Sequence, residues 1–322
     1  MLSVTPVTDQ TQWNTLVDRW GGHPMQAWQW GEFKAATGPW SAQRIQVLRD
    51  GDNQVIGGGQ LLIRTLPFPF RAIGYAPRGI MVQDMADFPA VADACANWCK
   101  ANFHAVSLKI DPPVEKLQLP ATWKQGSRVM LERTAIIDLQ PSEEDIMKGF
   151  HSRNARNYIR KGGRVGIEVE AATAKDIPAV LDLYHQTAER DGFSLHPDEY
   201  YEQAYTLLED LGQLTVTRFE GEVLSFMWNI TNRWGACELW AGAGEKGRKM
   251  RANYPLKWGA ILAAKRVGAE RYDMNGLLND GISEFKRSFQ HEETRFVGAW
   301  DRPNSPLYYV WEKALATYKK LR

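Results

Sequence analysis

One order of predicted secondary-structure elements occurs twice along this chain of 322 residues, and it limits the folds that the chain can adopt. The first half predicts a helix at 13–20, strands at 44–48 and 54–64, a helix at 88–103 and a strand at 106–110. The second half predicts a helix at 177–190, strands at 213–219, 223–231 and 234–240, a helix at 256–267 and a strand at 271–274. A last helix is predicted at 306–321. The repeated order indicates two similar α+β domains that pack closely.

Composition and cysteine content narrow the class of protein further. The net charge is +1 and 44% of the residues are hydrophobic, so the chain can form real cores and a polyanion site must be a local patch. Cys95, Cys99 and Cys237 are too few for a disulfide framework. Cys95 and Cys99 lie four residues apart on a predicted helix, but no Cys or His follows at ligand spacing. We therefore expect buried thiols and no metal site.

Targeting segments are not evident in the sequence. Residues 1–6 contain no basic stretch followed by an apolar one, so no secretory signal is predicted. No apolar run approaches the length that spans a bilayer as a helix. These features predict a soluble protein of the reducing cytoplasm.

A basic segment lies between the two halves, within residues 138–163. Ser142 resembles a helix N-cap, Gly162-Gly163 resembles a helix stop, and acidic residues are absent from 147 to 167. The cations of that window are Lys148, Arg153, Arg156, Arg160, Lys161 and Arg164. Three of the arginines, at 153, 156 and 160, are spaced to share one helix face. In a chain of near-zero net charge this face favours a phosphate-bearing partner, and a solvated face near a helix C-terminus is the alternative.

A second informative segment lies near the C-terminus. The last predicted strand ends at Asn275-Gly276, a turn signal, and a short loop follows it. Phe285 and Phe289 are four residues apart, so on a helix they share a face and anchor it, with Lys286 on an adjacent face. A cation fixed just beyond the carboxyl end of a strand lies where α/β folds hold their chemistry. An ordinary solvated lysine is the alternative.

Together these segments resemble the Fem family of peptidoglycan aminoacyltransferases. The resemblance extends over nearly the whole chain and includes the upstream run Gln29-Trp30-Gly-Glu-Phe-Lys34 as well as the two segments described above. It implies an α+β fold of two tandem domains like those of the acyl-CoA N-acetyltransferases (GNAT fold). The long helical arm of some members has no counterpart here, because residues 177–211 do not extend far enough to form one.

The resemblance also implies a division of labour between the domains. Residues 1–139 with 300–322 would bind the acceptor precursor, and residues 140–299 would bind aminoacyl-tRNA and hold a catalytic lysine. The donor would be aminoacyl-tRNA. The acceptor would be a stem-peptide amine of UDP-MurNAc-pentapeptide or of lipid II. No cofactor is implied, a monomer is expected, and peripheral contact with the inner face of the membrane is compatible with a lipid-linked acceptor.

Residues that act in the family correspond to several positions of this sequence. Lys286 would stabilise the oxyanion and the departing ribose oxygen in ester aminolysis, where orientation supplies much of the acceleration. Asp111 would orient or attract the attacking amine, unless it only forms the turn before Pro112. Lys34 would contact the nucleotide or the sugar-phosphate of the acceptor. The other expected substrate contacts are Trp30, Arg78, Trp240 and Tyr254, of which the two tryptophans are also compatible with packing roles.

Two other functions fit parts of the sequence. An acetyl-CoA-dependent acyltransferase of the same fold would hold pyrophosphate in a glycine-rich loop at a helix start. Residues 241–250 are glycine-rich and basic, but they lack the usual spacing, and Glu245 would repel the phosphates. A non-catalytic tRNA-binding module would have no need for Lys286 and Asp111 at two strand ends. The sequence leaves open the transferred amino acid, the form of the acceptor and the third residue of its stem.

Overall fold

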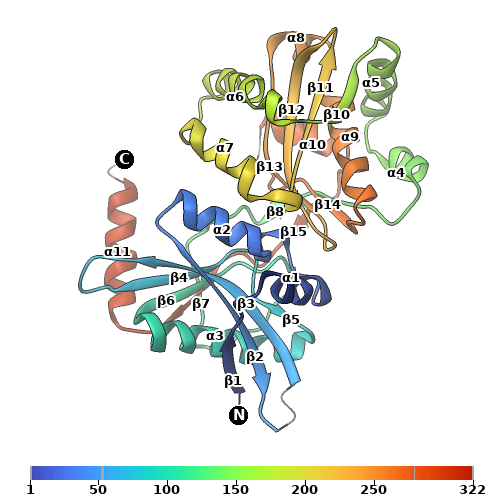
Figure 1. Ribbon diagram of the computed structural model, residues 1–322. Helices are drawn as coiled ribbons and strands as arrows, with labels where there is room; N and C mark the ends of the chain where they lie inside the picture. The colour runs from blue at the N-terminus through green and yellow to red at the C-terminus, as the bar shows by residue number, and fades with distance from the viewer. Residues whose placement is uncertain (1, 52–53, 279, 321–322) are drawn as a thin grey trace. The chain divides into compact units, whose positions relative to one another are not determined.

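A computed structural model describes residues 2–51, 54–278 and 280–320 of the chain (Figure 1). The chain divides into two compact units: unit 1 comprises Met1–Glu132 and Arg295–Arg322, and unit 2 comprises Arg133–Thr294. These boundaries precede the expected ones at 139/140 and 299/300. The strand β9 (Ile136–Asp138) pairs within the sheet of unit 2. The amide of Val297 donates to the carbonyl oxygen of Val114 in unit 1, at 2.8 Å, so the second boundary also moves toward the N-terminus.

The helices and strands of each unit follow in chain order. Unit 1 contains β1 (Leu2–Pro6), α1 (Gln10–Arg19), η1 (Pro24–Gln26), α2 (Trp28–Thr37), β2 (Ser41–Arg49), β3 (Gln54–Thr65), β4 (Ala72–Ala76), β5 (Met81–Val82), η2 (Met85–Asp87), α3 (Phe88–Phe103), β6 (Ala105–Ile110), β7 (Lys124–Gln125), β16 (Trp300–Pro303) and α11 (Leu307–Lys320). Unit 2 contains β8 (Arg133–Thr134), β9, α4 (Glu143–Gly149), α5 (Arg153–Arg164), β10 (Glu168–Ala171), η3 (Ala174–Asp176), α6 (Ile177–Asp191), α7 (Asp198–Leu207), η4 (Glu209–Leu211), β11 (Gly212–Phe219), β12 (Glu222–Thr231), β13 (Ala236–Ala243), α8 (Glu245–Lys249), α9 (Asn253–Arg266), β14 (Arg271–Asp273) and α10 (Gly281–Arg287). The short strand β15 (Thr294–Arg295) spans the second boundary.

Unit 1 is built on a sheet with the strand order β1-β2-β3-β4-β6-β16-β7, and β5 pairs with β3. The neighbours β4 and β6 run parallel, and α3 is the crossover that joins them. The helix places Val91, Cys95 and Cys99 in the core of the unit. The two cysteines are therefore buried thiols, as the sequence predicts, and burial raises the pKa of Cys99 to about 12.

Unit 2 repeats this plan on a sheet with the strand order β10-β11-β12-β13-β14-β9. Here β13 and β14 are the parallel pair, and α9 joins them (Figure 1). The buried stripe of α9 includes Leu256, Ala260, Ile261 and Ala264, which pack into the core of the unit. The parallel pair brings the carboxyl end of β14 beside β13, and the candidate site is built at this edge.

The predicted repeat of element order is confirmed. The elements α1, β2, β3, α3 and β6 correspond to α6, β11, β12, α9 and β14. The sequence did not predict β4, because its five residues Ala-Ile-Gly-Tyr-Ala include a glycine and two alanines and carry a weak strand signal. The helix predicted at 306–321 is α11, and Leu321 lies outside the described residues. No helix in the described part of the chain is both long and apolar enough to cross a bilayer.

The basic segment is two helices rather than one. After α4 the chain turns at Phe150, and the amides of His151 and Ser152 donate to carbonyl oxygens beyond α10 and not within a helix. The predicted stop at Gly162-Gly163 is wrong, because α5 continues to Arg164. A Cβ at Gly162 would lie 2.9 Å from Cγ of Pro255 on α9, so glycine is required there for close helix packing.

Candidate active site

Lys286 lies on α10 in unit 2, and its ammonium binds the turn that follows β14. Nζ donates hydrogen bonds to the carbonyl oxygens of Met274, at 2.5 Å, and Gly276, at 2.9 Å. Asn275 and Gly276 have φ angles of 48° and 104°, conformations that Asn and Gly adopt at low cost. Among the described residues Nζ makes no third hydrogen bond, which leaves one N–H for the oxygen of a ligand.

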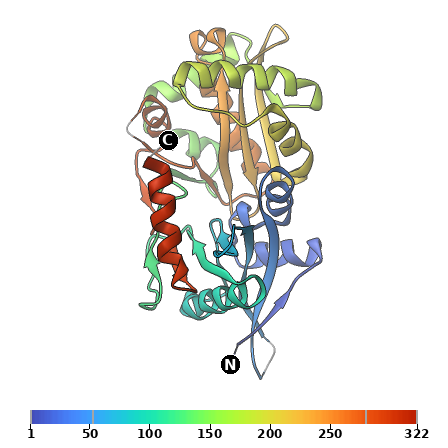
Figure 2. The same cartoon turned by 90° about the vertical axis from the view of Figure 1, so that its left-hand side faces the viewer.

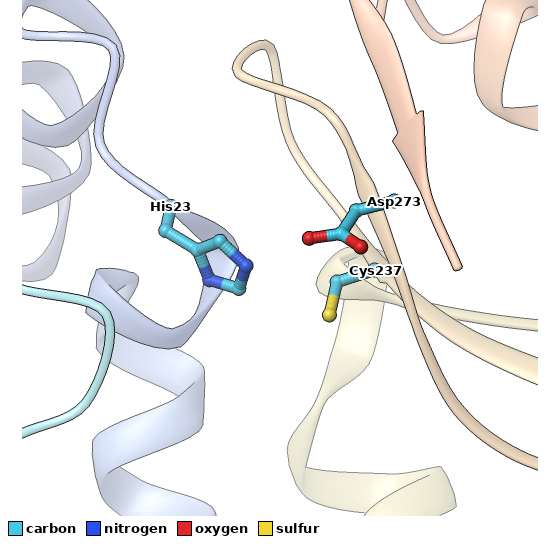
Figure 3. Close-up of side chains that lie close together, drawn as sticks. All are labelled: His23, Cys237 and Asp273. Carbon is cyan, nitrogen blue, oxygen red and sulfur yellow. The ribbon is translucent and has the colours of Figure 1, made fainter. Parts of the chain in front are cut away.

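Asp273 and Asn275 fix this turn. Oδ1 of Asp273 accepts hydrogen bonds from the amide of Asn275, at 2.7 Å, and from the hydroxyl of Thr134, at 2.5 Å. The side-chain amide of Asn275 donates to the carbonyl oxygen of Glu238, at 2.6 Å. Asp273 is buried on β14 and is the register partner of Cys237 on β13, and Figure 3 shows these two side chains beside each other. The turn is therefore attached to both strands of the parallel pair.

Two phenylalanines fix α10, as the sequence predicts. The ring centroids of Phe285 and Phe289 lie 5.3 Å apart with an interplanar angle of 75°. Tyr254, at the start of α9, packs against both rings at 5.1 and 5.9 Å. The Lys286 side chain is 13% exposed, so the alternative of an ordinary solvated lysine does not hold.

A buried carboxylate and a second lysine lie behind Lys286. Glu238 on β13 forms a close ion pair with Lys257 on α9, and their side chains are 8% and 1% exposed. Oε2 of Glu238 lies 4.0 Å from Nζ of Lys286. Burial lowers the pKa of Lys257 to about 8, although the charge of Glu238 acts in the opposite direction. Sequence reasoning missed this pair, but Lys257 occupies the stripe of α9 with Ala260 and Ala264, an unusual place for a lysine.

A pocket of about 530 Å³ adjoins this cluster in unit 2. Its walls come from the middle of β12, the end of β13, helices α9 and α10, and the C-terminal part of α6. Phe285, the neighbour of Lys286 in the chain, lines it together with Asn253 and Leu256. The lining is largely apolar with a few polar groups, among them Arg190, which pairs with Asp191 at 2.8 Å. This composition is typical of a site that binds a small molecule or one end of a larger one.

The cations of the basic segment differ in their surroundings. Arg153, Arg160, Lys161 and Arg164 are exposed on α5 and form no ion pair among the described residues. The guanidinium of Arg156 instead donates to the carbonyl oxygens of Phe150, at close range, and Lys148, at 3.4 Å. Nζ of Lys148 lies 2.7 Å from Glu144. Two of the six cations are therefore occupied within the protein, Arg156 by carbonyl oxygens and Lys148, although exposed, by a carboxylate.

Asp111 and Arg78 meet in unit 1. The carboxylate of Asp111 accepts hydrogen bonds from the hydroxyl of Tyr75, at 2.8 Å, and from the amide of Arg78, at 2.7 Å. The guanidinium of Arg78 is buried, donates to the carbonyl oxygen of Leu131 at 3.2 Å and lies 5.1 Å from the Phe296 ring centroid. Burial raises the pKa of Asp111, and the nearby Arg78 and Tyr75 oppose that rise. The carboxyl is thus a structured group with a perturbed affinity for protons, as functional carboxyls often are.

The remaining predicted contacts lie at separate places. In unit 1, Nζ of Lys34 lies 5.8 Å from the ring of Trp30, and burial lowers the pKa of this lysine. Trp30 is buried, and its Nε1 has no hydrogen-bond partner among the described residues. In unit 2, Trp240 packs edge-on against Trp228, at 5.3 Å, and against Tyr201, at 5.1 Å. Trp240 thus has a packing role, which the sequence left as an alternative.

The chain is similar in sequence to proteins of known class. Residues 149–287 match the family model described as an acetyltransferase (GNAT) domain. A lipid II:glycine glycyltransferase of Staphylococcus aureus is 29% identical over 209 residues, which cover 59% of this chain and 48% of that protein. The chain therefore spans about half the length of the curated relatives that it matches.

Solved structures share the fold. FemX superposes with a TM-score of 0.84 at 21% identity, over 96% of this chain and 100% of that one. A tandem GNAT protein from the clavulanic acid biosynthesis pathway superposes with a TM-score of 0.50 at 12% identity, over 95% and 99% of the two chains. The comparisons confirm the predicted fold of two GNAT-like domains and the predicted resemblance to the Fem enzymes.

Proposed function

We propose that this protein is an aminoacyltransferase that moves an amino acid from aminoacyl-tRNA to the stem-peptide amine of a peptidoglycan precursor. The product would be part of an interpeptide bridge. The observation that carries the proposal is the ammonium of Lys286, which two backbone carbonyls hold without a third hydrogen bond among the described residues, while Oε2 of Glu238 lies 4.0 Å from it. The name of the Staphylococcus aureus relative favours lipid II over the soluble nucleotide as the acceptor.

The proposed reaction balances without a cofactor. The neutral acceptor amine attacks the ester carbonyl, a C–N bond forms, and the C–O bond to the tRNA ribose breaks. The proton lost by the amine ends on the departing ribose oxygen. The carbonyl oxygen becomes an oxyanion, to which the third N–H of Lys286 would donate. Asp111 would attract the acceptor ammonium and take its proton, a role that suits a carboxyl whose pKa is raised by burial.

We assign the binding of the donor, aminoacyl-tRNA, to unit 2. The exposed cations of α5 would bind tRNA phosphates, and Asn157 and Tyr158 on the same helix offer polar groups to sugar and phosphate. The pocket beside Phe285 would hold the aminoacylated end of the tRNA. Its apolar walls suit an adenine ring or a small side chain, and its wall at α10 would bring the ester close to Lys286.

We assign the binding of the acceptor, the peptidoglycan precursor, to unit 1. Lys34 would bind its phosphate or sugar, with Trp30 beside it as a wall. The guanidinium of Arg78 is engaged by Leu131 and Phe296, so we assign Arg78 to holding Asp111 in place and not to phosphate contact. The donor and acceptor assignments are those of the domains expected from the sequence.

Peripheral contact with a membrane is also proposed for unit 1. Phe68 lies in the loop after β3 and is 82% exposed, and Arg71 stands 5.7 Å from its ring. Phe70 of the same loop packs against Trp311 on α11, and their ring centroids lie 5.3 Å apart. Figure 2 shows α11 in red on the side facing the viewer. Residues 54–83 contain no Asp or Glu, so the loop would not repel anionic headgroups. Aromatic rings beside cations are typical of proteins that bind at a lipid interface.

One experiment tests the function. Purified protein is incubated with a mixture of charged tRNAs and with either UDP-MurNAc-pentapeptide or lipid II in vesicles, and the product masses are read. We expect an acceptor heavier by one amino-acid residue, with lipid II as the better acceptor. A parallel reaction contains acetyl-CoA instead of charged tRNA. Acetylated product there, with no aminoacylated product, would replace the proposal by that of an acetyl-CoA-dependent enzyme. A Phe68→Ser variant that sediments with anionic vesicles as well as the wild type would refute the membrane contact.

A further inference from the structure

We infer that Glu238 and Lys257 are positioning residues for Lys286, and that Lys257 preserves the positive charge that Lys286 presents to a ligand. The inference rests on the proposed role of Lys286. Glu238 stands between the two lysines: Oε1 binds Nζ of Lys257, and Oε2 lies 4.0 Å from Nζ of Lys286. One carboxylate can neutralise one ammonium only, so the three groups together carry a net charge of about +1 while all are ionised.

Lys257 is placed to act through Glu238 and not on a substrate. Its side chain is buried below α9, where Nζ lies 5.7 Å from the ring centroid of Tyr272 and 5.6 Å from that of Phe285. It does not line the pocket that adjoins the site. A buried ammonium is costly unless it has a partner, and Glu238 is the carboxylate that it contacts.

The carboxylate would change partner if Lys257 were absent. Glu238 would then have Lys286 as its neighbouring cation, and the 4.0 Å separation would close to a direct ion pair. The ammonium would leave the carbonyls of Met274 and Gly276, or would bind them with its charge already neutralised. A neutralised ammonium stabilises an oxyanion poorly, because a second anion competes for the same positive charge. Lys257 therefore holds the Glu238 carboxylate in an ion pair, and the charge of Lys286 remains available to an oxyanion.

A pair of variants tests this balance. Lys257→Met leaves Lys286 as the neighbouring cation of Glu238, and Lys257→Met with Glu238→Gln removes both charges and restores the net charge of about +1 on Lys286. In single-turnover transfer we expect Lys257→Met to slow the rate by about 10²-fold, as for loss of one oxyanion donor, with the acceptor KM unchanged. The double variant should recover to within about threefold of the wild-type rate. Lys175→Met, which removes an exposed lysine of the same unit, serves as the control. Equal rates in Lys257→Met and wild type, or no recovery in a folded double variant, would overturn the inference.

A thermodynamic cycle tests the same balance without any substrate. Urea unfolding gives the equilibrium constants of wild type, Lys257→Met, Lys286→Met and the variant with both changes. We expect Lys286→Met to raise the unfolding equilibrium constant of the Lys257→Met protein by a factor at least ten times larger than that of the wild type, because Glu238 then loses its last neighbouring cation. With Glu238→Gln in all four proteins this excess should vanish. If the effects of Lys257→Met and Lys286→Met on stability are additive, the inference is overturned. If the additional destabilisation is measured but the protein transfers no amino acid, the proposed function alone is overturned.

Discussion

The hydroxyl of Tyr75 lies 2.8 Å from Oδ2 of Asp111 and donates a hydrogen bond to it. The other carboxylate oxygen accepts the amide of Arg78 at 2.7 Å. Burial raises the pKa of Asp111, and the charge and amide of Arg78, the hydroxyl of Tyr75 and the charge of Lys109 lower it. Burial prevails, so the carboxyl binds a proton more tightly in the folded chain than in the unfolded one.

This raised pKa predicts a pH dependence of stability. Between the ordinary value of 3.8 and the raised value, the folded protein holds a proton that the unfolded chain has lost, so the free energy of unfolding should fall as the pH rises. Asp111→Asn does not titrate. We expect the difference in unfolding free energy, wild type minus Asp111→Asn, to fall by about 1.4 kcal/mol for each unit by which the pKa is raised. Urea unfolding from pH 4 to pH 8 measures it, and a pH-independent difference would contradict the prediction.

The exposed arginines of α5 should set the salt dependence of tRNA binding. Replacing Arg153 and Arg160 with Ala removes two cations that have no ion pair among the described residues. The slope of log affinity against log salt should become shallower by about 0.7–0.9 for each tRNA phosphate that the variant no longer binds. Fluorescence titration at several salt concentrations measures this slope. Lys148→Ala is the matched control, because that lysine is already paired with Glu144.

Arg156 should behave differently from its neighbours on α5. Its guanidinium donates to the carbonyl oxygens that close the turn between α4 and α5. Arg156→Ala should therefore destabilise the protein, by about 1 kcal/mol for the missing hydrogen bonds, with a smaller change in the salt slope than Arg160→Ala. If Arg156→Ala left the unfolding midpoint unchanged and reduced the salt dependence of tRNA binding as much as Arg160→Ala does, Arg156 would face the tRNA.

Substitution of the two adjacent glycines of α5 by alanine should have opposite effects on stability. A Cβ at Gly162 would meet Cγ of Pro255 at 2.9 Å, and that ring is rigid, so Gly162→Ala should force α5 from α9 and cost about 1–3 kcal/mol. At Gly163 a Cβ would meet nothing within 4 Å, so Gly163→Ala should stabilise the helix by about 0.5–1 kcal/mol. Thermal unfolding of the two variants checks both signs, and equal shifts would reject the packing argument.

Lys34 should contribute to acceptor binding more than to turnover. Lys34→Ala removes a partly buried ammonium beside Trp30, and the loss of ground-state binding should raise the acceptor's KM by about tenfold with a smaller effect on kcat. Calorimetric titration of the acceptor measures the same loss directly. Unchanged acceptor affinity would assign Lys34 to structure alone.

Local sequence patterns were sufficient for much of the fold. Apolar spacing and turn residues predicted the repeated elements, and the spacing of Phe285 and Phe289 predicted the anchor of α10, because these signals lie within one or two turns of chain. The division of α4 from α5 was not predictable in this way. It depends on hydrogen bonds from the amides of His151 and Ser152 to the carbonyl oxygens of Phe289 and Ser288, which are distant in the sequence.

The candidate site was only half predictable for the same reason. Lys286 follows a recognisable strand and turn, whereas Glu238 and Lys257 lie 19 residues apart on a strand and a helix. They meet because α9 packs on the sheet in which β13 is the neighbour of β12, and no local pattern marks a glutamate at that register. The buried position of Lys257 in an otherwise apolar stripe was the available signal. Whether Asp111 and Lys34 act as the resemblance implies stays a prediction.

Lys286 should be the residue whose loss costs most in the chemical step. Lys286→Met keeps the length and the apolar stem between Phe285 and Phe289 but deletes the charge that Met274 and Gly276 hold in place. Single-turnover transfer from charged tRNA, with both substrates shown to be bound, should slow by about 10²–10³-fold. Lys286→Arg should restore only part of the rate, because a planar guanidinium cannot present a point charge to one oxygen. A Lys286→Met rate above about a third of the wild-type rate is far too fast for the loss of an oxyanion donor, and it would leave the lysine with a structural role only.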